Sequence, residues 1–277
     1  MRTRGARDTK AQVRDTKAEA RHDAVRMQQR YGVRSPADIR VEAWAHDHGI
    51  EIIEADLDGA SAQLIRVGDV VQIVLPMRVI KTCVRRFSLA HELYHFLKKH
   101  PSLTPTMMCI PKALRRRDED LRLHEVGSNA FAGAVLLPEF LLRKRCEVSP
   151  VTLDVPVSIA KEYDVSLLAS AIRFVELSSE RCAAVLSCRG QVEWAAASAT
   201  FSKPITRGKR LKRASVAWEY HATGKLDERE QLVPASAWLD TTANVDIFEH
   251  STCSPEHGTV LSLLWAPEQV GPQLGMR

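Results

Sequence analysis

The chain has 277 residues, 45% of them apolar and 26% charged, which is the composition of a folded globular protein. No apolar run approaches the ~20 residues of a membrane-spanning helix, and the charged N-terminal segment lacks the apolar stretch of a secretory signal, so we expect neither a membrane protein nor a secreted one. The six cysteines form no C-x-x-C pair, which indicates reduced thiols and a cytoplasmic protein. The net charge of +5 permits contact with nucleic acid but does not argue for it.

The first third of the chain predicts two helices and a small sheet. Residues 1–31 are basic and rich in Ala, Lys, Arg and Gln, which favours a helix with a frayed beginning. Ser35 followed by Pro36 is typical of a helix start, and this second helix is expected to end near Gly49. Strand-like runs follow, and Gly68-Asp69 predicts a hairpin between the last two of them; the runs are residues 50–55, 62–67 and 70–75.

The next predicted helix, residues 84–99, contains the motif His-Glu-x-x-His at His91, Glu92 and His95. The two histidines are four residues apart, so on a helix both imidazoles lie on one face, one turn apart. Glu92 lies beside the first histidine and can reach the same site without being a ligand. Two such imidazoles hold a zinc ion in zinc hydrolases, with a carboxylate directed at the bound water. The alternative is an ordinary helix with two surface histidines, and a third ligand is needed to decide.

The third ligand must come from outside this helix, because the chain lacks the H-E-x-x-H-x-x-G-x-x-H extension. After a connector at residues 101–111 and a charged stretch at residues 112–122, a strong helix is predicted over residues 124–143, with a kink or restart at Pro138. Glu125 begins this helix, in the arrangement of gluzincin-type peptidases, and Asn129 shares its face. The ordinary alternative for Glu125 is an exposed acid favoured by the helix dipole. The competing ligands are His124, Glu119 and Asp120.

The remainder of the chain changes character near residue 178. Residues 157–177 predict two short helices separated by a turn at residues 163–165, in the manner of a helix-turn-helix. Strand-like runs follow at residues 182–187, 191–195 and 260–265. The basic run from Lys203 to Arg213 is typical of a solvated loop, with an acidic partner or phosphate groups as the alternative.

Two linked sequence blocks carry a family resemblance. One surrounds the histidine motif, from Arg86 to Phe96, and the other runs from Glu125 to Pro138. Their order and spacing resemble the ImmA/IrrE family of bacterial zinc metallopeptidases, which typically shows R-F-[ST]-x-A-H-E-x-x-H and then E-x-x-x-N-x-F-A-x-x-L-L-x-P. The resemblance covers residues 35–175.

The resemblance implies that His91, His95 and Glu125 bind Zn²⁺ and that Glu92 is the catalytic base. Tyr94 and His124 are candidate donors to a developing oxyanion, with helix packing and a helix-start position as their ordinary roles. The chain departs from the family at Tyr94, where glycine is common, and at Gly127-Ser128, where acidic residues or alanine are more usual. The second departure weakens the helix slightly.

The expected fold class is α+β. A helical, zincin-like metallopeptidase domain with a small three-stranded sheet is followed by a helix-turn-helix-like segment and a smaller mixed α/β domain that resembles GAF-like sensor domains. An ordinary helical hairpin is favoured over DNA contact, because the second short helix offers base edges little besides Arg173. The expected divisions are a basic extension at 1–34, a peptidase domain at 35–177 with the helix-turn-helix-like segment at 157–175, and a sensor-like or substrate-docking domain at 178–277.

The resemblance further implies a cytoplasmic zinc endopeptidase that cleaves a DNA-binding repressor, such as a helix-turn-helix repressor, and so induces stress-response or mobile-element genes. The substrate is then a loop of a protein, and no membrane partner is expected. The alternative is a regulatory protein that uses the peptidase fold to bind a transcription factor or DNA without catalysis. An intact Glu92 favours the enzyme, because a binding module has no need of that carboxylate.

Overall fold

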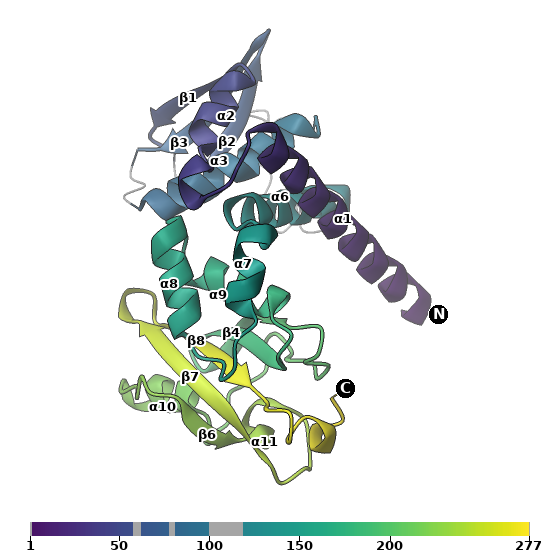
Figure 1. Cartoon of the computed structure of the whole chain (residues 1–277), viewed down its shortest axis with the longest axis vertical. Coiled ribbons are helices and arrows are strands. Elements are labelled where there is room, and N and C mark those ends of the chain that lie inside the picture. Colours follow the sequence, from purple (N-terminus) through teal and green to yellow (C-terminus); the bar gives the residue numbers. More distant parts are fainter. Residues whose placement is uncertain (1, 58–61, 78–80, 100–118, 277) are drawn as a thin grey trace. The chain divides into compact units, whose positions relative to one another are not determined.

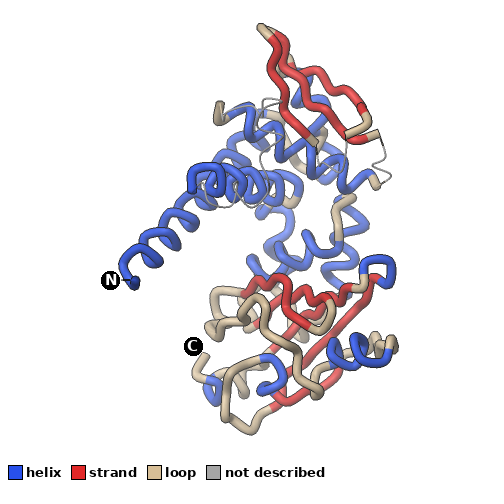
Figure 2. Tube along the Cα trace, turned by 180° about the vertical axis from the view of Figure 1, so that it is seen from behind, coloured by secondary structure: helices blue, strands red, loops and turns tan. Residues whose placement is uncertain are grey.

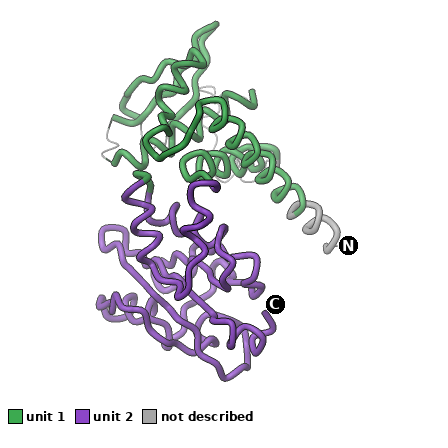
Figure 3. The backbone as a smooth tube through the Cα atoms, viewed as in Figure 1, with its two compact units in different colours: residues 1–138, 163–165 green, residues 139–162, 166–277 purple. Residues whose placement is uncertain are grey.

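The computed structural model describes residues 2–57, 62–77, 81–99 and 119–276, and only the backbone at residues 2–10 and 119. The connector expected at residues 101–111 and most of the charged stretch that follows it lie outside the described residues. Two compact units make up the chain (Figure 3): Met1–Pro138 with Tyr163–Val165, and Glu139–Glu162 with Ser166–Arg277.

The first unit contains a three-stranded sheet in the order β1-β3-β2. β1 (Ile50–Ala55) runs parallel to β3 (Val70–Pro76), whereas β2 (Gln63–Val67) runs antiparallel to β3. The turn between β2 and β3 places Gly68 at φ 60°, a left-handed conformation that glycine adopts without steric cost. The predicted hairpin is therefore confirmed. Among the described strands β2 pairs only with β3, so it lies at an edge of the sheet.

Helices cover this sheet and one another (Figure 1). α3 (Thr82–Leu97) packs on β2 and β3 and also contacts α6 (Glu119–Leu136), while α1 (Arg2–Arg30) lies along α6. The helix expected from Ser35 to Gly49 is divided in two, because Ile39 and Arg40 leave the helical conformation between a 3₁₀ turn at Pro36–Asp38 and α2 (Val41–Asp47). Apolar side chains buried in this unit include Trp44, Ile50, Ile73, Leu75, Leu89, Leu93, Phe131 and Leu136.

The second unit begins with three helices. α6 ends at Leu136 and α7 (Glu139–Cys146) begins directly after Pro138, which confirms the predicted restart at that proline. α8 (Asp154–Tyr163) and α9 (Leu167–Leu177) follow, with Ser166 capping α9 by accepting a hydrogen bond from the amide of Ala169 at 3.1 Å. α9 packs on α7 and on the first two strands of the second sheet.

The sheet of the second unit has five antiparallel strands in the order β5-β4-β8-β7-β6 (Figure 2). Three of them were expected: β4 (Cys182–Cys188), β5 (Gln191–Ala197) and β8 (Thr259–Trp265). β6 (Gln231–Pro234) and β7 (Asp246–Ser254) were not identified from the sequence. Two short helices, α10 (Val216–Thr223) and α11 (Ala235–Trp238), complete the unit.

A buried carboxylate links the sheet of the second unit to its short helices. Glu249 on β7 has no exposed surface and accepts hydrogen bonds from the amides of Val216 (3.0 Å) and Ala217 (2.9 Å) and from Trp238 Nε1 (2.8 Å). Ser251 Oγ donates a further bond at 3.0 Å. Desolvation raises the pKa of Glu249, and the donors oppose that rise. The carboxylate thus satisfies the N-terminus of α10, where amides lack helical partners.

These two sheets with their helices confirm the α+β fold class. The domain boundary expected near residue 178 stays a prediction; the compact units part between Pro138 and Glu139, so α7, α9 and most of α8 share a unit with the C-terminal sheet. No helix in the described part of the chain has the length and apolarity needed to cross a bilayer. The described cysteines are free thiols: Cys83, Cys146, Cys182, Cys188 and Cys253.

Candidate metal centre

α3 carries the histidine motif on the side that meets α6. Leu89, Ala90 and Leu93 are buried and fix the helix in the core, which leaves His91 and His95 one turn apart on a partly exposed face. The side chains of both histidines are 14% exposed, so their rings are held by packing. The Nε2 atoms of the two imidazoles lie 3.1 Å apart and point to a common position.

α6 supplies the carboxylate. Glu125 Oε2 lies 3.5 Å from His91 Nε2, and Glu125 Oε1 lies 3.6 Å from His95 Nε2. Among the described residues, these three side chains form the group of possible metal ligands, with all ligand atoms within 4.8 Å of one another. Glu125 is the most exposed of the three, at 59%, so one side of the group is open to solvent.

The spacing of these atoms fits a tetrahedral ion. Ligands about 2.1 Å from a zinc ion at tetrahedral corners lie ~3.4 Å from one another. The three separations of 3.1, 3.5 and 3.6 Å bracket that value. Two imidazole nitrogens and one carboxylate oxygen are also a ligand set of catalytic zinc sites, which leave the fourth position to water or substrate. The residues present therefore fit the ion without rearrangement.

Asn129 orients the first imidazole. Its Oδ1 lies 3.2 Å from His91 Nδ1, one turn along α6 from Glu125. Because an amide oxygen can only accept, His91 Nδ1 carries the hydrogen, and Nε2 is left with its lone pair toward the group. Burial lowers the pKa of His91, but the hydrogen bonds and charges of Glu125, Glu92 and Asn129 outweigh it, so without a metal the pKa of this histidine is raised.

Glu92 lies beside the ligand group and is partly buried. Desolvation raises the pKa of Glu92 to about 7, and a hydrogen bond from the backbone amide of Leu64 on β2 opposes the rise. A carboxyl that titrates near neutrality can both accept and return a proton at physiological pH. The bond to Leu64 also brings the edge strand β2 next to this carboxylate.

The two candidate oxyanion donors have different surroundings. The ring of Tyr94 stacks on Phe131 with centroids 4.6 Å apart, and its hydroxyl donates to Asp23 of α1 at 3.1 Å. These contacts pack Tyr94 between three helices, and its donor role stays a prediction. His124 precedes Glu125 on α6 and is half-buried. Its role stays a prediction.

Two of the competing metal ligands, His124 and Asp120, lie outside the group that the described residues bring together. Asp120 is exposed in the first turn of α6, and neither it nor His124 belongs to the cluster of His91, His95 and Glu125. The side chain of Glu119 is outside the described residues. Glu125 is therefore the carboxylate that the described residues offer to the two histidines.

Arg86 is a residue whose role the sequence did not reveal, although it begins the quoted motif block. Its guanidinium donates to the carbonyl oxygens of Tyr163, of Asp164 at 3.2 Å and of Ile39 at 3.2 Å. It satisfies the end of α8 and the break before α2, both of which lack backbone partners. One arginine thus fixes the start of the metal-binding helix to two distant segments of the first unit.

In the helix-turn-helix-like segment, the second helix, α9, is not exposed as a DNA-recognition helix would be. In α9 six residues are buried: Ser170, Ala171, Arg173, Phe174, Val175 and Leu177. None of its residues is fully exposed, and Arg173 is 6% exposed and lies 3.4 Å from Glu176. A helix that reads base edges must enter the major groove with free side chains. The burial of α9 supports a structural role for this helix, and the helical hairpin expected as the ordinary alternative stays a prediction.

Comparison with known proteins gives two findings. Residues 45–175 match the model of the peptidase M78 family, described as the IrrE N-terminal-like domain. A solved structure of a Mycobacterium tuberculosis transcriptional regulator is similar, with a TM-score of 0.57 and 15% sequence identity over 89% of this chain and 87% of that chain. At that identity the likeness concerns the fold alone. No curated protein matches the sequence.

Proposed function

We propose that the protein is a zinc-dependent endopeptidase, on the premise that residues 45–175 match the IrrE N-terminal-like peptidase family. The family supports a metallopeptidase-like activity; the metal, the catalytic residues and the substrate are parts of the proposal. The observation that carries it is the convergence of His91, His95 and Glu125 from two helices on one position.

The two imidazoles and the carboxylate would hold the metal, and zinc suits this nitrogen and oxygen set. When bound, zinc supplies Lewis-acid polarisation of a scissile carbonyl and lowers the pKa of water. Asn129 would keep the Nε2 lone pair of His91 directed at a bound metal ion. A ligand held by such a partner loses less entropy on binding, because its ring is already oriented.

Glu92 is the proposed general base. It would take the proton of the attacking water and deliver it to the leaving amine, a sequence that needs a group poised near neutral pH. In the metal-free protein, burial raises the pKa of Glu92 to about 7. The opposite charge of a bound cation would lower the value and favour the base form.

The edge strand β2 is the proposed binding surface for the substrate backbone. The amide of Leu64 bonds Glu92, so that amide points away from β3 and toward the site. Since alternate residues of a strand direct their amides to the same edge, the amide of Arg66 shares it. An extended peptide that pairs with this edge would lie beside Glu92, which favours an unfolded loop of a protein as substrate.

The proposed substrate is a DNA-binding repressor in the cytoplasm, whose loss would induce stress-response or mobile-element genes. The support is the family match and the fact that the structurally similar protein is a transcriptional regulator. The similarity to a transcriptional regulator also favours the second candidate, a non-catalytic regulator that binds a transcription factor through the peptidase fold.

The deciding experiment incubates the full-length protein with zinc and with repressors encoded beside its gene, and follows cleavage by mass spectrometry. Glu92→Gln should retain stoichiometric zinc and lose cleavage by two or more orders of magnitude, about the share that general base catalysis supplies. Glu256→Gln, the same change at an exposed site in the other unit, is the matched control. If a repressor binds to both the Glu92→Gln and the Glu256→Gln protein and stays uncleaved with both, the result favours the non-catalytic regulator.

A further inference from the structure

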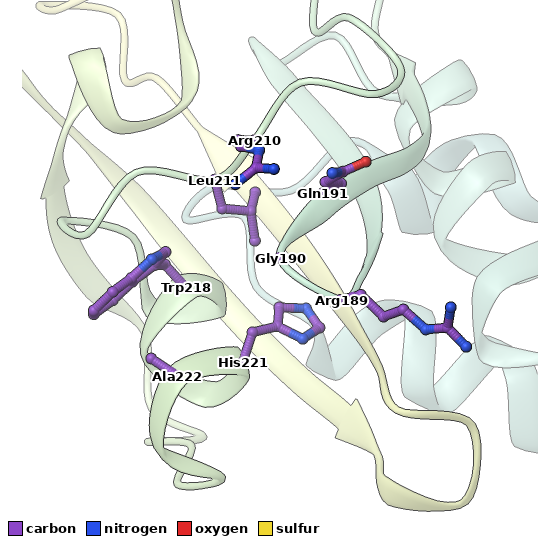
Figure 4. A pocket seen from close by; sticks show the side chains of 8 residues that line it. All are labelled: Arg189, Gly190, Gln191, Arg210, Leu211, Trp218, His221 and Ala222. Atoms are coloured by element: carbon purple, nitrogen blue, oxygen red, sulfur yellow. The ribbon is translucent and has the colours of Figure 1, made fainter.

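The second unit contains a hollow away from the metal centre (Figure 4). It lies between the turn that joins β4 to β5, the segment around Arg210 and one side of α10, and its volume is about 280 Å³. The lining includes Arg189, Gln191, Arg210, Trp218 and His221, and no lining residue is acidic. A volume near the lower end of the ~300–1,000 Å³ of ligand pockets limits an occupant to a small molecule.

Two arginines stand at this hollow without acidic partners. Within the described part of the chain, neither Arg189 nor Arg210 forms an ion pair. Basic residues next to Arg210 are engaged elsewhere: Lys209 Nζ lies 2.6 Å from Asp240, and Arg207 lies 3.5 Å from Glu193. The unpaired arginines thus give the hollow a positive potential that its own unit does not neutralise.

Arg189 occupies a backbone position that does not suit it. The β4–β5 hairpin has a two-residue loop, and both residues have positive φ, 50° at Arg189 and 72° at Gly190. Such turns strongly prefer asparagine or glycine at the first of these positions, because a longer side chain is strained there. An arginine kept at that cost is typical of a residue with a function outside the turn. It lies at the rim of the hollow, with its guanidinium directed outward (Figure 4).

α10 contributes an aromatic and a polar surface. Trp218 is half-buried, and the guanidinium of Arg213 lies over its ring, 5.6 Å from the centroid. His221 Nε2 is 3.0 Å from Ser187 Oγ, and burial lowers the pKa of this histidine, so its ring is neutral at pH 7. The positive charge of the lining therefore belongs to the arginines, and the ring of Trp218 offers a flat apolar wall.

We infer that this hollow binds a small organic anion that carries a planar ring. Arg210 would pair with a carboxylate or a phosphate, for which a guanidinium fork is suited, and the exposed side chain of Arg189 would turn inward from the rim to join it. Gln191 would donate to the same group, and Trp218 would contact the ring. Benzoate and adenosine monophosphate represent the two sources of this chemistry, and both are small enough for the hollow. The site is independent of the proposed peptidase activity.

Isothermal titration of the full-length protein at low ionic strength tests the inference with four probes. These are adenosine monophosphate, benzoate, adenosine, which has the ring without the charge, and inorganic phosphate, which has the charge without the ring. At least one of the first two should bind in a saturable 1:1 manner, roughly tenfold or more tightly than adenosine and phosphate. Which of the two binds identifies the anionic group. Absence of saturable binding by both at millimolar concentration would overturn the inference.

Reversing the charge of an arginine at the hollow tests whether the anion binds there. Arg210→Glu should weaken binding roughly tenfold or more, because it removes a charged hydrogen bond and repels the anion. Arg207→Glu, on the same segment but paired with Glu193, is the matched control and should have a much smaller effect. Equal losses in the two variants would show general electrostatic attraction and would overturn the site.

Arg189→Asn separates the binding role from the structural one. Asparagine suits the left-handed position, so thermal denaturation should occur at a higher temperature, while binding of the active probe should weaken roughly tenfold. Unchanged binding in this variant would contradict the part assigned to the turn.

Discussion

At the contact of α3 with α6, the ring of Tyr94 lies next to the space that a side chain at Gly127 would enter. A Cβ built on Gly127 would lie 3.3 Å from Tyr94 Cε1 and 3.3 Å from Thr16 Cγ2 of α1. Both positions are among the departures from the ImmA/IrrE pattern that the sequence resembles: Tyr94 stands where glycine is common, and Gly127-Ser128 stands where acidic residues or alanine are more usual. The departures compensate each other, because the ring fills the volume that a side chain at position 127 would need.

Substitutions at this pair should be strongly non-additive. Gly127→Leu is expected to destabilise the protein by about 1–3 kcal/mol through overpacking, whereas Gly127→Ala should be nearly neutral, since a gain of ~1 kcal/mol in helix propensity offsets the tight contact. In a Tyr94→Ala background the leucine should cost about 1 kcal/mol less. Urea denaturation of the four proteins of this cycle measures the coupling. Additive effects would mean that the ring does not restrict residue 127.

Asn129→Ala should weaken zinc binding by about 10–100-fold, because His91 would lose the partner that fixes its ring and tautomer. His91→Ala or His95→Ala should abolish stoichiometric binding. Competition with a chelator of known affinity gives the constants. Asn244→Ala, an exposed asparagine of the second unit, controls for the amide deletion. An affinity unchanged by Asn129→Ala would show that the 3.2 Å contact has no role in orientation.

Metal-free protein should lose stability from pH 5 to pH 8 because of Glu92. Its folded pKa of about 7 lies above the ordinary value of 4.5. The folded state therefore holds the proton more tightly, and the contribution present below pH 4.5 is lost as the pH rises through 7. Between pH 5 and pH 8, the free energy of unfolding of the wild-type protein should fall by about 1–3 kcal/mol relative to that of Glu92→Gln. Denaturation of both proteins in the presence of chelator at pH 5 and pH 8 tests this prediction. If the two proteins differ in unfolding free energy by the same amount at both pH values, Glu92 has an ordinary pKa.

Arg66→Pro should impair cleavage of a protein substrate without loss of zinc. Proline removes the amide that points to the free edge of β2 and leaves the pairing with β3 intact, which an edge strand tolerates. The rate at low substrate concentration should fall roughly tenfold, the value of one lost hydrogen bond to the bound peptide. Arg66→Ala keeps the amide and separates the side chain from the backbone. Equal effects of both substitutions would exclude backbone pairing.

A chain that ends at residue 178 should bind zinc but expose apolar surface. His91, His95 and Glu125 all lie in the first unit, whereas α9 would lose β4 and β5, against which Phe174, Val175 and its other buried side chains pack. Increased binding of a hydrophobic dye and aggregation in gel filtration are the expected signs. Loss of zinc from a folded fraction would show that the second unit helps to build the metal group.

Much of the candidate site could be predicted because its information is local. Spacing within α3 places two imidazoles on one face, and the restart at Pro138 follows from the missing amide of proline. The strands β1, β2 and β3 were visible as apolar runs between glycines. The division of the helix after Ser35 was not, because it depends on Ile39, whose carbonyl bonds to Arg86 47 residues later.

Long-range packing accounts for what the sequence did not reveal. The hydrogen bond from the Tyr94 hydroxyl to Asp23 joins residues 71 positions apart, and its partner could not be identified from the sequence. The short strand β6 lies at the edge of its sheet with an exposed Leu232, so it shows no apolar run. The burial of α9 likewise depends on strands that follow it in the chain. No local pattern carries these contacts.

The carboxylate of Glu249 has a consequence for the order in which the second unit folds. The first amides of α10 are bonded by a side chain that lies 32 and 33 residues further along the chain, on β7. α10 therefore cannot complete its N-terminus until β7 has joined β8, and it must lose that end when the strand leaves. In native-state hydrogen exchange, Val216 and Ala217 should exchange only with the global opening of the sheet, although they begin a helix of eight residues that could otherwise fray independently.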